Sequence, residues 1–231
     1  MLINHRHKFI FIHIPKCAGG SVHQMLNEQV EGSEAIPGLH THCTASQVRD
    51  VFGASTFGDY YKFAIVRHPI ARLKSLYAFG LSRALERQAR RRVGLPVKTT
   101  TSAENDAAVI ERLTRLGEVG WITTYPHHVD VYGKDVKRMC QTEWFEDEGG
   151  RLVDDVFKVE ALEDMPPVLG QRLGLRLTLP SQRVHVSPNK DARSDAWPEE
   201  LIDFALTYHR RVFDLYGYDL PPGLAHTKAV R

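Results

Sequence analysis

Residues 8–21 read KFIFIHIPKCAGGS, and this stretch decides the fold. Its first half is short, aromatic and β-branched and is ended by Pro15, which predicts a buried strand rather than a helix. The residues through Gly20 break regular structure, and Ser21 is a good N-cap for a helix over residues 22–30. The sequence therefore predicts a strand, a glycine-containing loop and a helix in direct succession.

The same order of elements recurs further along the chain. Residues 60–66 form an apolar segment, Arg67 and His68 follow, and Pro69 stands where a helix is expected to begin. Two strand-to-helix units of this kind imply parallel strands with helices packed on the sheet. We therefore expect an α/β fold with a central parallel sheet flanked by helices, and a ligand site beyond the carboxyl ends of the strands.

The rest of the chain fits one domain with an elaboration. Residues 155–159 predict a third strand, and a helical segment follows that Pro166 and Pro167 interrupt. A final helix is expected from Pro198 to a stop at Gly217. We predict a single domain over residues 1–231 with a helical insertion around residues 81–142.

Composition excludes several classes of protein. The 231 residues are 42% hydrophobic and 25% charged, which excludes collagen-like, disordered and coiled-coil chains. A net charge of +2 gives no global field for nucleic acid or a membrane, so an anion site must be local and neither partner is expected. Without an apolar run long enough for a span, without a secretory signal and with three scattered cysteines, the chain is expected to be cytoplasmic.

The loop from Lys16 to Ser21 has the chemistry of an anion cradle. A tight turn there aims backbone N–H groups, the positive end of a helix, an ammonium and a hydroxyl at one small volume. In the nucleotide-binding P-loop the lysine follows the second glycine, whereas here it precedes both, which argues against the usual use of ATP or GTP. A glycine-containing turn without a ligand is the alternative.

A second candidate lies in residues 63–77. Arg67 stands at the carboxyl end of its strand beside the expected crevice, and Ser75 lies on the following helix. An arginine fork matches a phosphate and a serine adds a neutral donor. A surface ion pair of Arg67 is the alternative.

Together the two stretches resemble the sulfotransferases that use 3′-phosphoadenosine 5′-phosphosulfate (PAPS), in particular the carbohydrate group that includes heparan sulfate 2-O-sulfotransferase. The resemblance implies the P-loop-NTPase-like sulfotransferase fold. It assigns the 5′-phosphosulfate to the loop that matches P-K-T-A-G-T-S, and the 3′-phosphate to the stretch that matches V-R-x-P-x-x-R-x-x-S-x-Y. The donor-binding residues implied are Lys16, Cys17, Ala18, Gly19, Gly20, Ser21, Arg67 and Ser75, with His185, Asn189 and Lys190 in a late loop.

The resemblance covers most of the chain except roughly residues 81–142. Cys17 and Gly20 replace the usual threonines of the first motif. These replacements remove two hydroxyl contacts and leave the backbone cradle intact. The thiol of Cys17 is expected to be a tolerated substitution, with an oxidation-sensitive thiol as the alternative.

A pair of histidines follows the first predicted helix. The heparan sulfate enzyme has a similar H-x-H pair, so the resemblance implies that His42 removes the acceptor proton and that His40 orients or assists. Histidine suits this task because its ordinary pKa lies near neutral pH. Ordinary polar loop histidines and a metal site of His40, His42 and Cys43 are the alternatives.

These features predict a PAPS-dependent sulfotransferase. We expect in-line transfer of the sulfuryl group to a hydroxyl or amine of a small-molecule or glycan acceptor, with Lys16 stabilising the leaving group and no metal required. A nucleotide-dependent phosphoryl transferase and a catalytically inactive nucleotide-binding module are the alternatives. The basic run from Arg83 to Arg92 is expected to be a solvated helix face, with a groove for an acidic glycan as the alternative.

Overall fold

The computed structural model describes residues 1–97, 102–124, 135–181 and 197–219. Regular elements follow one another in the order β1 (Leu2–Asn4), β2 (Phe9–Ile12), α1 (Gly19–Gln29), β3 (Ser33–Glu34), α2 (Ala45–Phe52), α3 (Ala54–Gly58), β4 (Tyr61–Val66), α4 (Pro69–Arg92), α5 (Ala103–Thr124), η1 (Gln141–Trp144), β5 (Glu146–Asp147), β6 (Gly150–Arg151), β7 (Asp155–Lys158), η2 (Val159–Asp164), α6 (Met165–Leu173) and α7 (Glu199–Tyr216).

The chain divides into two compact units. The first comprises Met1–His68, Met139–Val186 and Arg211–Gly217, and the second comprises the remaining segments. The strands of the main sheet all belong to the first unit, whereas α4 and α5 belong to the second. Helices α4 and α5 cover much of the segment for which a helical insertion was expected, and the single domain over the whole chain stays a prediction.

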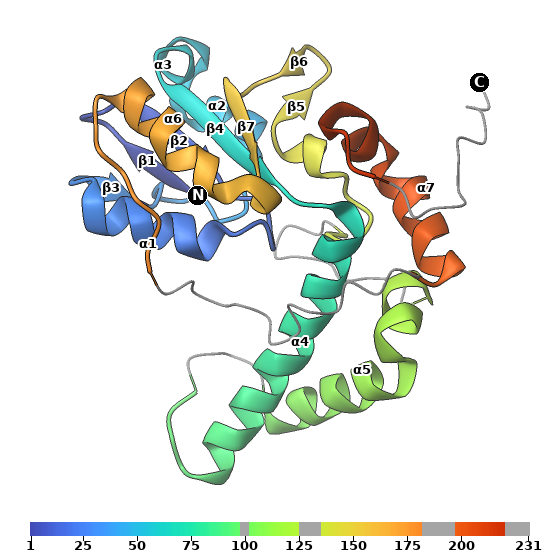
Figure 1. Cartoon of the computed structure of the whole chain (residues 1–231). Coiled ribbons are helices and arrows are strands. Elements are labelled where there is room, and N and C mark those ends of the chain that lie inside the picture. The colour runs from blue at the N-terminus through green and yellow to red at the C-terminus, as the bar shows by residue number, and fades with distance from the viewer. Residues whose placement is uncertain (98–101, 125–134, 182–196, 220–231) are drawn as a thin grey trace. The chain divides into compact units, whose positions relative to one another are not determined.

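Among the described residues, five strands form one sheet in the order β3-β1-β2-β4-β7 (Figure 1). Strands β2, β4 and β7 are parallel, and Ile12 pairs with Ala64 while Val66 pairs with Lys158. Strand β1 pairs antiparallel with the free edge of β2, and β3 pairs antiparallel with β1. The α/β class is confirmed, and the sheet is mixed because its parallel part carries an antiparallel edge.

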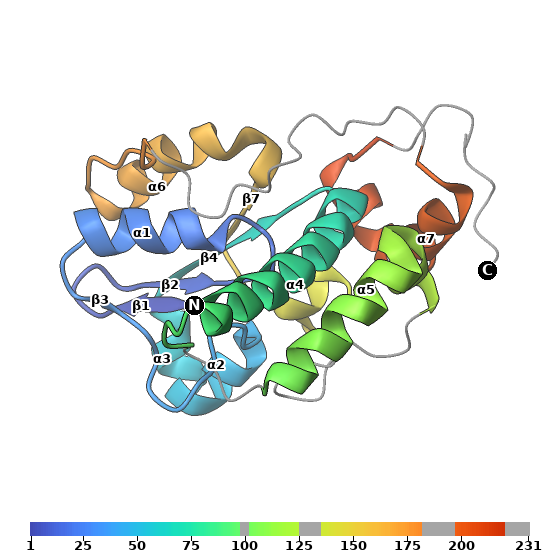
Figure 2. The same cartoon turned by 90° about the horizontal axis from the view of Figure 1, so that it is seen from below.

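Helices cover both faces of this sheet. In Figure 2, α1 and α6 lie on one face, and α2 and α3 lie on the other. The first face buries an apolar cluster that α1, α6 and the parallel strands share, because alternate strand residues point to the same side. The members on the strands are Phe9, Phe11, Phe63 and Ile65, and those on the helices include Val22, Met25, Leu26, Met165 and Leu169.

Two details of the helices differ from the sequence prediction. Helix α1 begins at Gly19 with Ala18 as its N-cap, so Ser21 lies inside the first turn and is not the cap. The left-handed backbone of Ala18, with φ of 57°, starts the helix earlier than a side-chain cap would. Pro166 and Pro167 do not interrupt a helix but lie in the first turn of α6, where a proline loses no intrahelical hydrogen bond.

Part of the basic run on α4 is engaged in ion pairs within the second unit. The Asp106 side chain on α5 is buried and accepts hydrogen bonds from Arg87, at 2.8 Å, and from Arg91. These bonds, that of Arg87 first, hold the pKa of Asp106 below its ordinary value. Arg83 pairs with Glu86 at 2.7 Å on α4 itself. These pairs favour a structural role for the run over a glycan groove.

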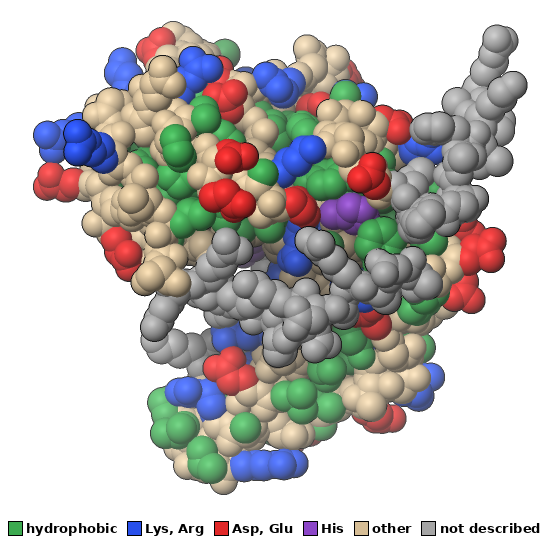
Figure 3. Space-filling view, in the orientation of Figure 1, with side chains coloured by type: hydrophobic (Ala, Val, Ile, Leu, Met, Phe, Trp, Pro, Cys, Tyr) green, Lys and Arg blue, Asp and Glu red, His purple; other side chains and the backbone are tan. Residues whose placement is uncertain are grey.

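The face shown in Figure 3 carries no dominant charge among its described residues. In Figure 3, acidic and basic side chains of the described residues are interspersed on the face shown, in keeping with the net charge of +2. Within the described part of the chain, no helix is long and apolar enough to cross a membrane.

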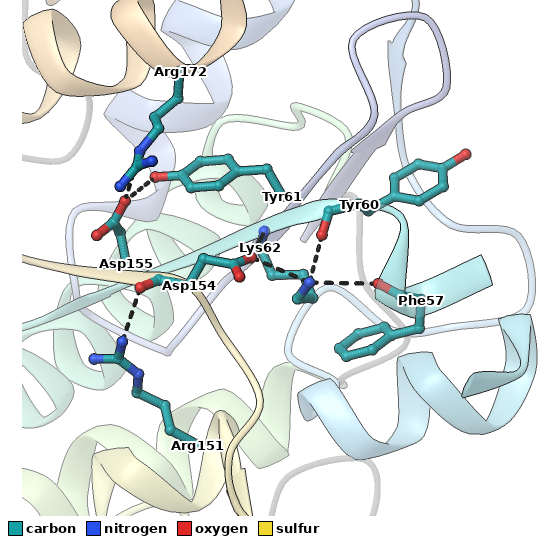
Figure 4. Close-up of polar contacts among 8 residues, drawn as sticks. All are labelled: Phe57, Tyr60, Tyr61, Lys62, Arg151, Asp154, Asp155 and Arg172. Atoms are coloured by element: carbon teal, nitrogen blue, oxygen red, sulfur yellow. Dashed lines mark hydrogen bonds and ion pairs between the residues drawn. The ribbon is translucent and has the colours of Figure 1, made fainter. Parts of the chain in front are cut away.

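A polar cluster fastens β4 to the chain around β7 (Figure 4). Lys62 is nearly buried, and its ammonium lies 3.1 Å from an oxygen of Asp154 and donates to the backbone oxygens of Phe57 and Tyr60. On the neighbouring residues, the Tyr61 hydroxyl donates to Asp155 at 2.7 Å. Because the nearly buried Lys62 ammonium joins two backbone oxygens and a carboxylate, it stabilises the start of the central strand.

We predict that Lys62→Met destabilises the protein by about 1–3 kcal/mol, since the hydrogen bonds to two backbone oxygens and the ion pair with Asp154 are lost. Denaturant unfolding followed by circular dichroism measures the change. Lys8→Met on the exposed turn before β2 is the matched control and should leave the unfolding midpoint unchanged. An equal midpoint for wild type and Lys62→Met would contradict the proposed stabilisation.

Candidate active site

The loop after β2 has a strained and compact backbone. Lys16 and Ala18 adopt left-handed conformations, with φ of 67° and 57°, although neither is glycine. Such residues cost roughly 1–3 kcal/mol each and gather at functional sites. The turn is closed by a hydrogen bond from the Cys17 N–H to the Ile14 oxygen at 3.3 Å. It leads directly into α1, whose first N–H groups lack partners within the helix.

Gly19 is a position where only glycine fits. A Cβ atom there would lie 1.7 Å from Nε2 of His13, so the imidazole ring rests against the glycine backbone. Nδ1 of His13 is buried and has no hydrogen-bond partner among the described residues. Burial, followed by the positive charges of nearby groups that include His42 and Lys16, lowers the pKa of His13. His13 is therefore neutral at neutral pH.

His40 and His42 are held in opposite tautomers. Nδ1 of His42 lies 2.9 Å from the backbone oxygen of His13, and because a carbonyl only accepts, Nδ1 carries the proton. Nδ1 of His40 accepts the backbone N–H of His42 at 3.2 Å, so its neutral ring carries the proton on Nε2. In their neutral forms, His42 thus has its lone pair on Nε2, as a base requires, whereas Nε2 of His40 is a donor.

The His13 ring connects His42 to the loop. The ring centroids of His13 and His42 are 4.5 Å apart, and the same His13 ring contacts Gly19. The candidate base therefore lies beside the candidate anion cradle. His23 on α1 also faces this group, with its ring centroid 5.0 Å from that of His13, and burial lowers its pKa to about 4.

Arg67 meets the loop from the end of β4. Its Nη1 donates to the backbone oxygen of Lys16 at 3.4 Å, at the long end of the hydrogen-bond range. Side chains also hold the backbone here, since Gln141 accepts the N–H of Arg67 and Glu160 accepts that of His68, both at 2.8 Å. The two segments that the sequence singled out for anion binding thus come together in the first unit.

The other predicted site residues are placed less fully. Ser75 lies on α4 in the second unit, so the geometry of the first unit does not test its role. His185, Asn189 and Lys190 lie outside the described residues. Ser21 is buried in the first turn of α1, and the thiol of Cys17 is buried and donates to Gln141 at 3.2 Å. A buried, hydrogen-bonded thiol agrees with a tolerated substitution at Cys17.

The alternative of a metal site at His40, His42 and Cys43 gains no support. Among the residues that the structure describes, no three His, Cys, Asp or Glu side chains are placed to hold a metal ion. His40 and His42 instead make the hydrogen bonds to backbone described above, and Cys43 is fully buried.

Sequence reasoning missed three residues that shape the site, namely His13, Gln141 and Trp144. His13 directly precedes the conspicuous loop, and its polar ring at the end of an apolar strand was the available signal. Gln141 and Trp144 contact residues that are 74 to 124 positions away in the chain. No local pattern marks contacts of that separation.

Fold and site together define an α/β protein whose candidate anion site lies at the carboxyl ends of parallel strands. A family model described as the Sulfotransferase family matches residues 1–133, more than half of the chain. The chain therefore belongs to the sulfotransferase family. Neither the curated proteins nor the solved structures gave a significant match.

We predict that Gly19→Ala destabilises the first unit by about 1–3 kcal/mol, since the new methyl group overlaps the His13 ring. In a His13→Ala background the same change should cost clearly less, because the clash is gone. Chemical unfolding of the four proteins of this cycle measures the difference.

The matched control is Gly58→Ala on α3, where an added Cβ atom has nothing within 4 Å. It should be neutral or slightly stabilising. Equal costs of Gly19→Ala with and without His13 would show that the ring does not impose the glycine.

Proposed function

We propose that this sulfotransferase takes the sulfuryl group from PAPS and transfers it to a hydroxyl or amine of an acceptor, with carbohydrates as the expected class. The observation that carries the proposal is the meeting of Arg67, the Lys16 loop and the tautomer-fixed His42 in one unit. A donor with two separated anionic groups needs two cationic contacts, and an acceptor hydroxyl needs a base.

The cationic and hydrogen-bond-donating groups of the site fit a nucleotide with two anionic ends. The loop offers the Lys16 ammonium and the first N–H groups of α1, where the helix dipole favours negative charge. The His13 ring lies against Gly19 and requires a glycine there, so no side chain projects from the loop at this position. Arg67 adds a guanidinium at the end of β4, and in this proposal it holds the 3′-phosphate.

In this proposal Lys16 acts on the charge that develops during transfer. The acceptor oxygen bonds to sulfur while the bond from sulfur to the 5′-phosphate oxygen breaks, and adenosine 3′,5′-bisphosphate (PAP) leaves. Lys16 stabilises the negative charge that grows on that bridging oxygen, so it favours the transition state over the ground state. Arg67 and the loop backbone hold the nucleotide in both states, and they supply binding and alignment.

His42 is the proposed base and His40 its assistant. The lone pair on Nε2 of His42 accepts the proton of the acceptor hydroxyl as the oxygen attacks sulfur. The backbone oxygen of His13 holds the Nδ1 proton and stabilises the imidazolium that forms. The protonated Nε2 of neutral His40 suits a donor that orients the acceptor, so the tautomers support His42 rather than His40 as the base.

Two other functions would use the same cradle. A phosphoryl transferase is disfavoured because Lys16 precedes the glycines instead of following them. A nucleotide-binding module without catalysis would have no need of a histidine whose tautomer is fixed beside the cradle. Binding and turnover separate these possibilities from sulfuryl transfer.

We predict that PAP without magnesium raises the melting temperature strongly, since a ligand at 100 times its Kd adds about 2.7 kcal/mol to stability. Lys16→Ala should lose roughly 10²–10³-fold in turnover, by comparison with the loss of one oxyanion donor, and clearly less in PAP affinity, because Arg67 and the loop backbone still hold the nucleotide. Turnover is read as PAP release from PAPS over a panel of sugars and small alcohols.

Lys8→Ala, on the exposed turn before β2, is the control for this experiment. Stabilisation by ATP with magnesium alone would identify a kinase-like protein. PAP binding without turnover on any acceptor would favour the inactive module, and unchanged turnover in Lys16→Ala would remove Lys16 from the mechanism.

We further predict that His42→Asn lowers turnover by roughly 10²–10⁴-fold, because the general base is lost. His40→Asn should cause a clearly smaller loss, because His42 still supplies the base. PAP affinity should change little in either variant. A larger loss in His40→Asn than in His42→Asn would reverse the assignment.

A further inference from the structure

The short helix η1 contacts three segments of the candidate site, at Cys17, Arg67 and His42. It comprises Gln141–Trp144, outside residues 1–133 that the family model matches. The side chains of Gln141 and Trp144 are fully buried although both carry polar groups. Buried polar groups are normally hydrogen-bonded, so their partners show what the turn is holding.

Gln141 grips the backbone of Arg67 at two points. Its Oε1 accepts the N–H of Arg67 at 2.8 Å, and its Nε2 donates to the oxygen of the same residue, also at 2.8 Å. Arg67 stands one residue beyond the last residue of β4, where the pairing between β4 and β7 ends at Val66 and Lys158. The Gln141 amide therefore makes the two backbone hydrogen bonds that a neighbouring strand would make. It thereby fixes the backbone of Arg67, from which the guanidinium extends.

The same amide reaches the loop. The thiol of Cys17 donates to Oε1 of Gln141 at 3.2 Å. One side chain thus joins both segments that are proposed to hold the two ends of the nucleotide. A displacement of Gln141 would move Arg67 and Cys17 relative to each other.

Trp144 holds the histidine loop. Its indole Nε1 donates to the backbone oxygen of His42 at 3.1 Å, while the ring of His42 is held by the oxygen of His13. The residue that carries the proposed base is therefore fixed at its main chain by Trp144 and at its side chain by His13.

The geometry of η1 explains how one turn contacts both Arg67 and His42. In a 3₁₀ helix, side chains three residues apart lie on the same side, about 6 Å apart along the axis. Gln141 and Trp144 have this spacing. The turn is braced from within, because Glu143 accepts the N–H of Cys140 at 2.6 Å and the Phe145 N–H donates to Thr142 at 2.9 Å.

We propose that Gln141 and Trp144 are two positioning residues with separate tasks. Gln141 sets the distance between Arg67 and the loop and thereby the affinity for the nucleotide, whereas Trp144 places His42 and thereby serves proton removal. This inference rests on the proposed function, because it takes Arg67 and the loop as the nucleotide site and His42 as the base.

The test measures PAP affinity by calorimetry and the ¹⁵N shifts of the His42 ring by NMR, neither of which needs an acceptor. Gln141→Leu should weaken PAP binding by about tenfold or more, equivalent to ~1.4 kcal/mol per tenfold change in Kd. Its His42 ring signals should match those of wild type. Trp144→Phe should shift or broaden the His42 signals and keep the Kd for PAP within about twofold, since it leaves the Gln141 contacts in place.

Gln29→Leu is the matched control. Gln29 makes the same two-point contact with a backbone, since it donates to the Thr178 oxygen at 2.7 Å and accepts the Thr178 N–H at 2.9 Å. It lies at the far end of α1, about 15 Å along the helix from Gly19. Gln29→Leu should leave both PAP affinity and the His42 signals unchanged, which would show that loss of a two-point amide contact elsewhere in the unit does not weaken PAP binding.

The outcomes are distinct. Failure of the wild-type protein to bind PAP would overturn the proposed function, whereas wild-type binding with unchanged affinity in Gln141→Leu would overturn only the role of Gln141. Weakened PAP binding or unchanged His42 signals in Trp144→Phe would overturn the division of tasks. Should Gln141→Leu fail to fold, Gln141→Met fills similar space without either amide contact, adds no charge, and should also weaken PAP binding.

Discussion

The parallel pairing of β2 with β4 is the constraint on which the site depends. Because Ile12 pairs with Ala64, β2 and β4 end at the same edge of the sheet. The loop that follows β2 therefore meets Arg67, which follows β4. An apolar core shared by the two strands, α1 and α6 stabilises this register. A shift of register would move Lys16 away from Arg67, and the cationic groups that the donor requires would separate.

The electrostatic character of the site is local. The net charge is only +2, so a cradle for an anion has to come from Lys16, Arg67 and the start of α1. The histidines next to the loop contribute shape and hydrogen bonds and add little charge, because burial lowers the pKa of His13 and of His23. A neutral His13 can pack against Gly19 and hold His42 without competing with Lys16 for the anion.

The sequence predicted the features that have local signals. Short apolar runs, rich in aromatic and β-branched residues before Pro15, identified β2 and β4, and Pro69 marked the first residue of α4. The antiparallel β1 and β3 went unpredicted because strands of three and two residues carry no period. In the candidate site, the Lys16–Ser21 loop was predicted from its glycines. The clamp by Gln141 was not, because a polar side chain distant in sequence becomes informative only when the fold places it beside Arg67.

The most direct measurement is a crystal structure of the protein with bound PAP. The account predicts the 5′-phosphate against the Lys16–Ser21 loop and the N-terminus of α1, and the 3′-phosphate on the Arg67 guanidinium, with Nε2 of His42 facing the position that sulfur would occupy. PAP bound elsewhere, or with Arg67 turned away from both of its phosphates, would contradict the account.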